Sequence, residues 1–294
     1  MKLVKRYSLS PPDERRKVLR TLCAIPLIAA MPIALASAPI RIGVTPVFLD
    51  DQVGFLERWR SYLEQRLDRP VRFVQRGSYS EVLRLLLEGG ADFAWLCGFP
   101  YWRNRHRLEL VVAPVYRGAP LYQAYLIRSR QHPELDTLES LRGKVFAYSD
   151  PDSNSGFLYP QHRLKQMGHG NGRFFGRSFY TWAHRRVVEA VAIQLAHAGA
   201  VDGYVWDVLD HLHPELTRDT EIIERSPEFG FPPIVAAPTT SDAERRLMRT
   251  VLTAMAHDPD GAALLGLLAL DGFEPVPASL YASIGRMAET VQAS

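Results

Sequence analysis

Residues 71–98, VRFVQRGSYSEVLRLLLEGGADFAWLCG, decide the fold class of this 294-residue chain. The segment starts as a short strand that ends in a Gly-Ser turn. A serine then opens a helical run, Gly89 and Gly90 close it, and the apolar run 91–98 follows as another strand. A strand, a helix and a strand in this order are typical of a parallel sheet covered by helices.

The alternation of strand and helix continues on both sides of this segment. Upstream, residues 40–46 are a β-branched run, and residues 53–67 place apolar side chains at helical spacing. Downstream, we expect strands over 110–130, 145–150 and 201–206, helices over 157–168 and 184–199, and a helical tail. The repeat of the pattern beyond Tyr122 indicates a second lobe, and we expect the tail to return to the first.

We therefore predict an α/β protein of two lobes, each a mixed, mainly parallel sheet flanked by helices. Lobe 1 is expected to comprise residues 39–121 plus 229–294, and lobe 2 residues 122–228. Ligands of such sheets collect at the carboxyl ends of the strands, and small ligands bind in clefts between lobes. The interface between the lobes is thus the expected place of a binding site.

Residues 1–36 do not fit this pattern and are interpreted as a cleaved export signal. They contain seven basic residues and an apolar run that is short for a membrane span and ends in small residues. We expect a periplasmic mature protein, and the pair Arg15-Arg16 leaves a Sec-type and a twin-arginine signal both open. The remaining chain has 28 basic and 30 acidic residues, so the net charge falls from +3 to −2 and does not indicate nucleic-acid binding.

Residues that could carry out chemistry are few. Of the two cysteines, Cys23 lies in the signal, so Cys97 has no partner for an internal disulfide. Cys97 lies in the apolar run FAWLCGF and is interpreted as a small buried hydrophobe. The chain has no nucleophile elbow, no Walker loop and no histidine group with metal-ligand spacing. We predict no catalytic residue, no metal ion and no cofactor.

Short polar side chains gather in residues 149–160, SDPDSNSGFLYP, between a predicted strand and a predicted helix. Ser153, Asn154 and Ser155 stand directly before Gly156. The first amides of a helix have no partners within it, and the helix dipole favours negative charge in front of them. One interpretation is a plain helix cap, and the other is a cradle for an anion.

Four further residues lie where they could border the same cleft. His184 stands at the start of the next predicted helix and could donate to an oxyanion. Tyr79 follows the second strand, and Tyr122 lies where the chain crosses to the second lobe. Asp207 ends the predicted strand of VDGYVWD and could accept from a phosphoryl hydroxyl or an amine, whereas Asp202 is interpreted as a turn residue.

The segment DPDSNSGFLYP and the later segment AHRRVVEAVAIQLAHAGAVDGYVWD together resemble the periplasmic phosphate, phosphite and phosphonate-binding proteins of ABC importers. These proteins have the type 2 periplasmic-binding-protein fold. The resemblance implies that the phosphoryl oxygens lie between the lobes. The residues that it places around them are Ser153, Asn154, Ser155, His184, Tyr79 and Tyr122. Family members that carry amino-substituted phosphonates use carboxylates deeper in the cleft, and the proline at 232 argues against such a ligand here.

The chain is therefore expected to be a monomeric receptor that delivers a small phosphorus oxyanion to an ABC transporter permease. A second interpretation is a sensory subunit that binds the same ligand and signals to a membrane kinase. A third is an enzyme on the same fold, although Cys97 has no evident base partner. Which oxyanion is bound stays open at this point, because phosphate, phosphite and small phosphonates share the features that the turn recognises.

Overall fold

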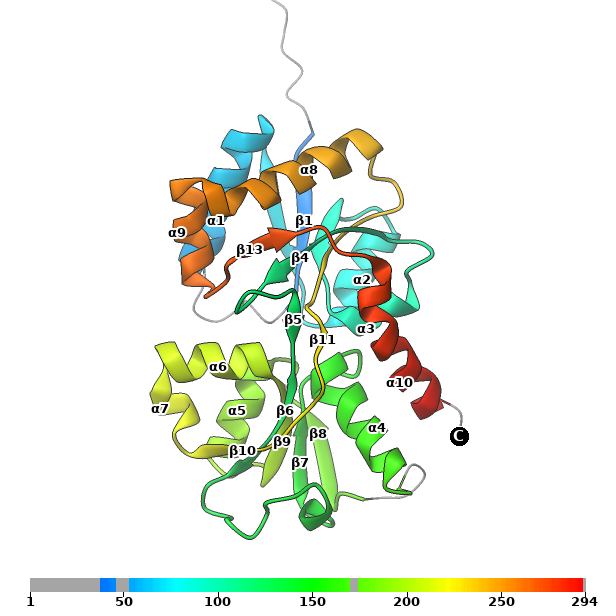
Figure 1. The fold of residues 1–294 in the computed structure, drawn as a ribbon, viewed down its shortest axis with the longest axis vertical. Coiled ribbons are helices and arrows are strands. Elements are labelled where there is room, and N and C mark those ends of the chain that lie inside the picture. Colours follow the sequence, from blue (N-terminus) through cyan, green and yellow to red (C-terminus); the bar gives the residue numbers. More distant parts are fainter. Residues whose placement is uncertain (1–37, 46–52, 170–173, 293–294) are drawn as a thin grey trace, which may run out of the picture. The chain divides into compact units, whose positions relative to one another are not determined.

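The computed structural model describes residues 38–45, 53–169 and 174–292. The predicted export signal, residues 1–36, lies outside the described residues. All described residues belong to one compact unit of the chain. Within them, two separate mixed sheets flanked by helices confirm the predicted two-lobed α/β fold (Figure 1).

The first sheet has six strands, in the order β13-β4-β12-β3-β1-β2. Their bounds are β1 (Ile40–Val44), β2 (Val71–Gln75), β3 (Phe93–Trp95), β4 (Glu109–Val115), β12 (Ile234–Ala236) and β13 (Gly272–Glu274). The helices associated with it are α1 (Val53–Leu67), α2 (Tyr79–Leu87), α3 (Gly98–Arg103), α8 (Asp242–Ala254) and α9 (Pro259–Leu267). Helix α1 contacts both α8 and α9, whereas α2 packs against β1 and β3 (Figure 1).

The second sheet has five strands, in the order β10-β6-β9-β7-β8. Their bounds are β6 (Ala124–Ser129), β7 (Val145–Tyr148), β8 (Arg177–Tyr180), β9 (Ala198–Asp202) and β10 (Thr220–Arg225). The helices around it are α4 (Tyr159–Gln166), α5 (His184–Ala192), α6 (Gly203–Leu212) and α7 (Pro214–Thr217).

The described residues also form four short helical turns along the chain. These are η2 (Glu139–Leu141), η3 (Asn154–Leu158), η4 (Met255–His257) and η5 (Ala278–Tyr281).

Two extended segments connect the sheets. Strand β5 (Leu121–Tyr122) leads from β4 into the second sheet, and β11 (Phe229–Gly230) leads back, and the two pair antiparallel. After β11 the chain adds β12 and β13 to the first sheet. The last helix, α10 (Ala282–Gln292), packs against both α3 and α4 (Figure 1).

Two details of the predicted fold are wrong. Parallel pairing does not predominate, because it is confined to β1 with β2 and β3 and to β7 with β8 and β9. Strands β4 and β10 lead into the two crossings, and β6 and β12 leave them. Each outgoing strand therefore runs opposite to the incoming strand beside it, so β4 pairs antiparallel with β12, and β10 with β6. The predicted strand 201–206 is also wrong, since β9 ends at Asp202 and helix α6 begins at the next residue.

The core explains why the predicted helices form where they do. In α1, Phe55, Trp59 and Leu63 are buried on one face, at the spacing that the sequence shows. In the second sheet, all five residues of β9 are buried, as expected for a central strand covered on both sides. The carboxyl ends of β1, β3, β7 and β9 carry the residues described next.

Candidate functional site

The polar turn after β7 is a capped helix start. Ser153 is the N-cap of η3, and its hydroxyl accepts a hydrogen bond from the amide of Gly156 at 2.9 Å. Gly156 is required for close packing, because a Cβ there would stand 1.9 Å from Ser149 Oγ. Ser153 and Gly156 therefore form an ordinary helix cap. The missing side chain of Gly156 leaves space for the side chain of Ser149.

The same turn also holds buried polar atoms that the cap leaves unused. Ser149 Oγ, Asn154 Oδ1 and Ser155 Oγ have no hydrogen-bond partner among the described residues. Buried polar atoms are nearly always paired, so three in one turn require an explanation. The Asn154 amide nitrogen donates to the Tyr122 hydroxyl at 2.9 Å, which leaves the hydroxyl hydrogen of Tyr122 able to donate onward. These atoms are suited to binding a polar ligand that the two lobes enclose.

His184 is fixed in one protonation state by its neighbour on β9. Its Nδ1 accepts a hydrogen bond from the backbone amide of Asp202 at 3.0 Å, so the ring proton must lie on Nε2. Burial lowers the pKa of His184 to about 3, which keeps the ring neutral at physiological pH. His184 therefore offers one N–H donor and no positive charge.

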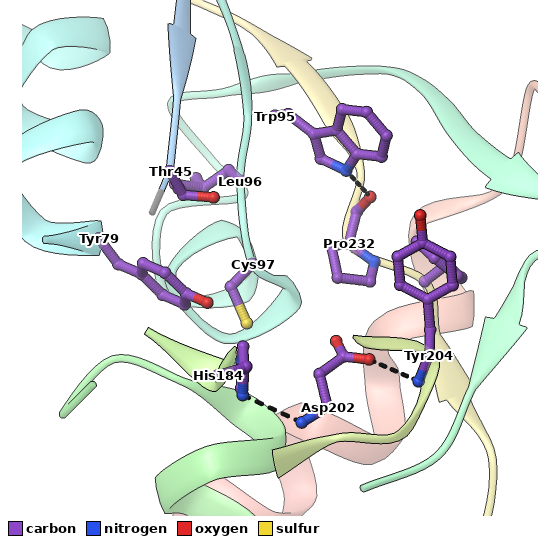
Figure 2. A pocket seen from close by; sticks show the side chains of 10 residues that line it. Thr45, Tyr79, Trp95, Leu96, Cys97, His184, Asp202, Tyr204 and Pro232 are labelled. Atoms are coloured by element: carbon purple, nitrogen blue, oxygen red, sulfur yellow. Dashed lines mark hydrogen bonds between the residues drawn. The ribbon is translucent and has the colours of Figure 1, made fainter. Parts of the chain in front are cut away.

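A small cavity of about 20 Å³ lies beside His184, which is room for about one water molecule (Figure 2). Tyr122 and the three residues 153–155 of the polar turn are not among its lining residues. Its polar lining is Thr45, Tyr79, Cys97, His184 and Asp202. Its apolar wall consists of Trp95, Leu96, Tyr204, Phe231 and Pro232. None of the described residues that line it is a lysine or an arginine. An oxyanion is larger than one water, so the walls must move apart to admit it.

The polar turn borders this cavity through Cys97 and β9. The amide of Asn154 donates to the Cys97 sulfur at 3.4 Å, and η3 packs against β9, which ends at the lining residue Asp202. Burial raises the pKa of the Cys97 thiol to about 12, so the group is a neutral thiol and not a nucleophile. The interpretation of Cys97 as a buried hydrophobe agrees with this state.

The structure brings six of the seven predicted site residues together and separates the seventh. Tyr79 and His184 line the cavity, Asn154 contacts both Tyr122 and Cys97, and Ser153 and Ser155 flank Asn154. Asp207 lies in α6, where its carboxylate accepts from the hydroxyls of Tyr116 and Tyr125 and pairs with Arg117. Its predicted place at the end of a strand is therefore wrong, because β9 already ends at Asp202.

Sequence reasoning missed Asp202, the carboxylate that does line the cavity. Asp202 is the last residue of β9 and the N-cap of α6, and one carboxylate oxygen accepts from the amides of Tyr204 and Val205. An aspartate that precedes a glycine is a common turn signal, so the sequence did not indicate that Asp202 also lines the cavity. The cap could have been recognised only if the helix had been predicted to start at Gly203.

Polar contacts between the lobes lie on either side of the cavity. On one side, the backbone amide of Tyr79 donates to Asp150 at 3.0 Å, and Arg103 pairs with Asp152 at 3.1 Å. On the other, the Tyr116 hydroxyl donates to Asp207 at 3.0 Å. All three contacts join a residue of one lobe to a residue of the other, so they hold the lobes together around the cavity.

Two kinds of feature are absent from the described residues. In the part of the chain that the structure describes, no group of three histidine, cysteine or acidic residues is placed to hold a metal ion. Among the same residues, no helix combines the length and the apolar character needed to cross a bilayer.

Comparisons with known proteins agree on one family. Residues 42–281 match the family model described as ABC transporter, phosphonate, periplasmic substrate-binding protein. The chain is 32% identical over 111 residues to the phosphate-import protein PhnD of Mycolicibacterium smegmatis, a match that covers 36% of this chain and 35% of that protein. The chain thus spans about a third of the length of that curated relative.

Solved structures show the same fold at low sequence identity. A binding protein component of an ABC phosphonate transporter from Pseudomonas aeruginosa is 20% identical, with a TM-score of 0.78 over 86% of this chain and 87% of that one. PhnD1 from Prochlorococcus marinus in complex with methylphosphonate is 16% identical, with a TM-score of 0.75 over 87% and 98% of the two chains. An ancestral arginine-binding protein, 14% identical, has a TM-score of 0.59 over 79% and 98%.

Proposed function

Because this chain belongs to the family of periplasmic substrate-binding proteins of phosphonate ABC transporters, we propose that it captures a small phosphorus oxyanion between its lobes. The family is one of binding proteins and not of enzymes, so no chemistry on the ligand is needed. The ligand class is phosphonate, phosphite or phosphate. After capture, the protein delivers this ligand to the membrane permease of an ABC importer.

One observation carries the proposal. The buried turn after β7 leaves the Ser155 hydroxyl without a partner, beside a cavity into which neutral donors of both lobes point. Each hydrogen bond to a charged group contributes about 1.5–3 kcal/mol, so four or five of them suffice for micromolar binding after the cost of closure. Ser155, Asn154 and His184 from lobe 2 would hold the oxygens, and Tyr79 and Tyr122 would wall the site.

The proposed lobes meet at the paired strands β5 and β11. Lobe 1 comprises residues 39–121 plus 229–294, and lobe 2 residues 122–228, so both crossings fall at a lobe boundary. A hinge at this two-stranded ribbon would let the walls part for the ligand and close over it. The closed form is the shape that a permease would recognise, and a monomer suffices for this cycle.

Export to the periplasm and the role as importer subunit belong to the same proposal. The family model supports them, as does the basic and apolar composition of residues 1–36. A sensory subunit is the alternative with the same ligand, and pull-down of the mature protein with an ABC permease or with a membrane kinase separates the two.

The test compares two serines of the same turn. Ser155→Ala removes an unused buried hydroxyl, so we expect it to abolish ligand-induced stabilisation while the melting temperature of the ligand-free protein stays nearly unchanged. Ser153→Ala removes the helix cap and should cost about 1 kcal/mol of stability. The readout is thermal unfolding with phosphate, phosphite, methylphosphonate and sulfate. If none of the three phosphorus oxyanions stabilises the wild type, the proposed function is wrong.

A further inference from the structure

Asp202 has one carboxylate oxygen that the fold uses and one that it does not. The first accepts from the amides of Tyr204 and Val205 at 2.9 and 3.4 Å and so caps α6. The second accepts no hydrogen bond from any described residue, and Figure 2 shows it pointing toward the space between Cys97 and Pro232. The residue is only 4% exposed, so this oxygen is turned toward the cavity and away from bulk solvent.

Among the described residues, no lysine or arginine is among the groups that shift the pKa of Asp202. The titratable groups that line the cavity or interact electrostatically with Asp202 are neutral or acidic: Tyr79 of α2, Cys97 before α3, Tyr122 of β5, His184 of α5, and Tyr204 and Asp207 of α6. The elements that pack against β9 also carry arginines: Arg128 of β6 pairs with Glu221, Arg185 of α5 pairs with Glu189, and Arg186 of α5 is exposed. Burial, opposed by the two amides and aided by the charge of Asp207, raises the pKa of Asp202 to about 7. A carboxylate and an oxyanion without a cation between them repel each other strongly in such surroundings.

A single proton removes this conflict. Either the ligand arrives with a protonated oxygen, which donates to the free carboxylate oxygen, or the carboxylic acid of Asp202 donates to a ligand oxygen. The two descriptions contain the same atoms and the same charge. They differ only in which oxygen the proton is drawn on, and in both the hydrogen bond is charge-assisted.

We propose that Asp202 and the bound phosphorus oxyanion share one proton, so that the protein selects ligands able to bring or accept that proton. The proposal rests on the proposed function and names the form of the ligand that the site takes. Oxyanions with an acidic P–OH group qualify, because their last ionisation lies near neutrality, as for a phosphate monoester at about 6. Sulfate, which holds no proton at neutral pH, is disfavoured.

The proposal predicts proton uptake on binding. At a pH at which both the ligand and Asp202 have lost their protons, each binding event must take one proton from the buffer. The apparent Kd should then increase about tenfold for each pH unit. Isothermal titration of methylphosphonate into the wild type, in buffers of different ionisation enthalpy between about pH 6 and pH 9, measures both quantities.

The substitution Asp202→Asn tests how much of the pH dependence of binding comes from the Asp202 carboxylate. The amide oxygen of asparagine still caps α6, and its NH₂ group donates to a fully ionised ligand, so proton uptake at high pH and the steep rise in Kd should disappear. Sulfate affinity should increase relative to the wild type. Asp258→Asn is the matched control, because Asp258 also caps a helix, α9, but lies away from the cavity, and this variant should keep the wild-type pH profile.

The outcomes separate this proposal from the previous one. If methylphosphonate or phosphite binds the wild type without proton uptake, or if Asp202→Asn keeps the wild-type pH profile, proton sharing at Asp202 is refuted while the proposed function stands. If no phosphorus oxyanion binds either protein at any pH, the proposed function itself fails. Should the variant unfold, the buffer series on the wild type alone decides the question.

Discussion

Two tyrosines donate to the same carboxylate oxygen of Asp207, and only one of them reaches it from the other lobe. Tyr116 lies in the turn after β4, which is tied to the first sheet because Asp271 accepts from the amide of Gly118 at 2.7 Å. Tyr125 lies on β6 in the second sheet, as Asp207 does through α6. The hydroxyl-to-carboxylate distances are 3.0 and 3.3 Å. Tyr116→Phe therefore removes a bond between lobes, and Tyr125→Phe removes one within a lobe.

If the lobes open at the proposed hinge, the bond from Tyr116 can form only in the closed state, so its loss should appear as weaker ligand binding. A hydrogen bond to a charged group contributes about 1.5–3 kcal/mol. If the ligand binds only the closed form, this energy converts to an increase of about ten- to 150-fold in Kd. The ring of Tyr116 stays in place, since it packs edge-on against Tyr204 with centroids 5.1 Å apart.

The assay is isothermal titration with methylphosphonate, with thermal unfolding of each ligand-free variant alongside. We expect Tyr116→Phe to weaken binding, and Tyr125→Phe to lower the melting temperature while leaving Kd within about threefold of the wild type. Equal effects of the two substitutions on Kd would refute the reasoning, because the lobe from which the hydroxyl comes would then make no difference. Wild-type affinity in Tyr116→Phe would refute it as well.

Two more predictions concern the stability of the ligand-free protein. Gly156→Ala places a Cβ 1.9 Å from Ser149 Oγ, so the unfolding free energy measured with urea should fall by about 1–3 kcal/mol, and Ser149→Gly in the same chain should restore part of it. A stability that Gly156→Ala leaves unchanged would contradict the close packing of this turn. His184, with a pKa lowered from 6.5 to about 3, makes stability increase with pH between these values, because the unfolded chain binds the extra proton. Asp202, with a pKa raised from 3.8 to about 7, makes stability decrease with pH over its own window, because the folded chain holds the proton. Between about pH 4 and 6.5 the two slopes oppose each other, so His184→Gln should make stability fall with pH and Asp202→Asn should make it rise. Urea unfolding across this range measures both slopes, and identical slopes in the two variants would contradict the assignment.

Much of the fold follows from local signals in the sequence. The helical spacing of Phe55, Trp59 and Leu63 predicts α1 with the bounds that the structure has, and Ser78 with the glycines after α2 predicts that helix. These signals act over a few residues, since periodicity and capping depend on neighbours along the chain. The crowded polar turn at Ser153 could be recognised for the same reason, as a helix start with more hydroxyls than a cap needs.

Other features depend on contacts between residues far apart in the chain. The antiparallel pairing of β12 with β3 and β4 arises because the chain returns from the second lobe, which no local pattern records. Likewise the tautomer of His184 depends on the backbone amide of Asp202, which lies on another element.

The two aspartates of VDGYVWD show the division most clearly. The sequence by itself determined the two lobes and the polar turn, and it led us to expect one carboxylate of this segment, Asp207, at the rim of the site. Which carboxylate borders the cavity was decided by the tertiary structure, because α6 starts directly after β9 and carries Asp207 away to Tyr116 and Tyr125. The physical reason is that a change from strand to helix within one residue redirects every following side chain, and only the packing of β9 between its neighbours sets where that change occurs.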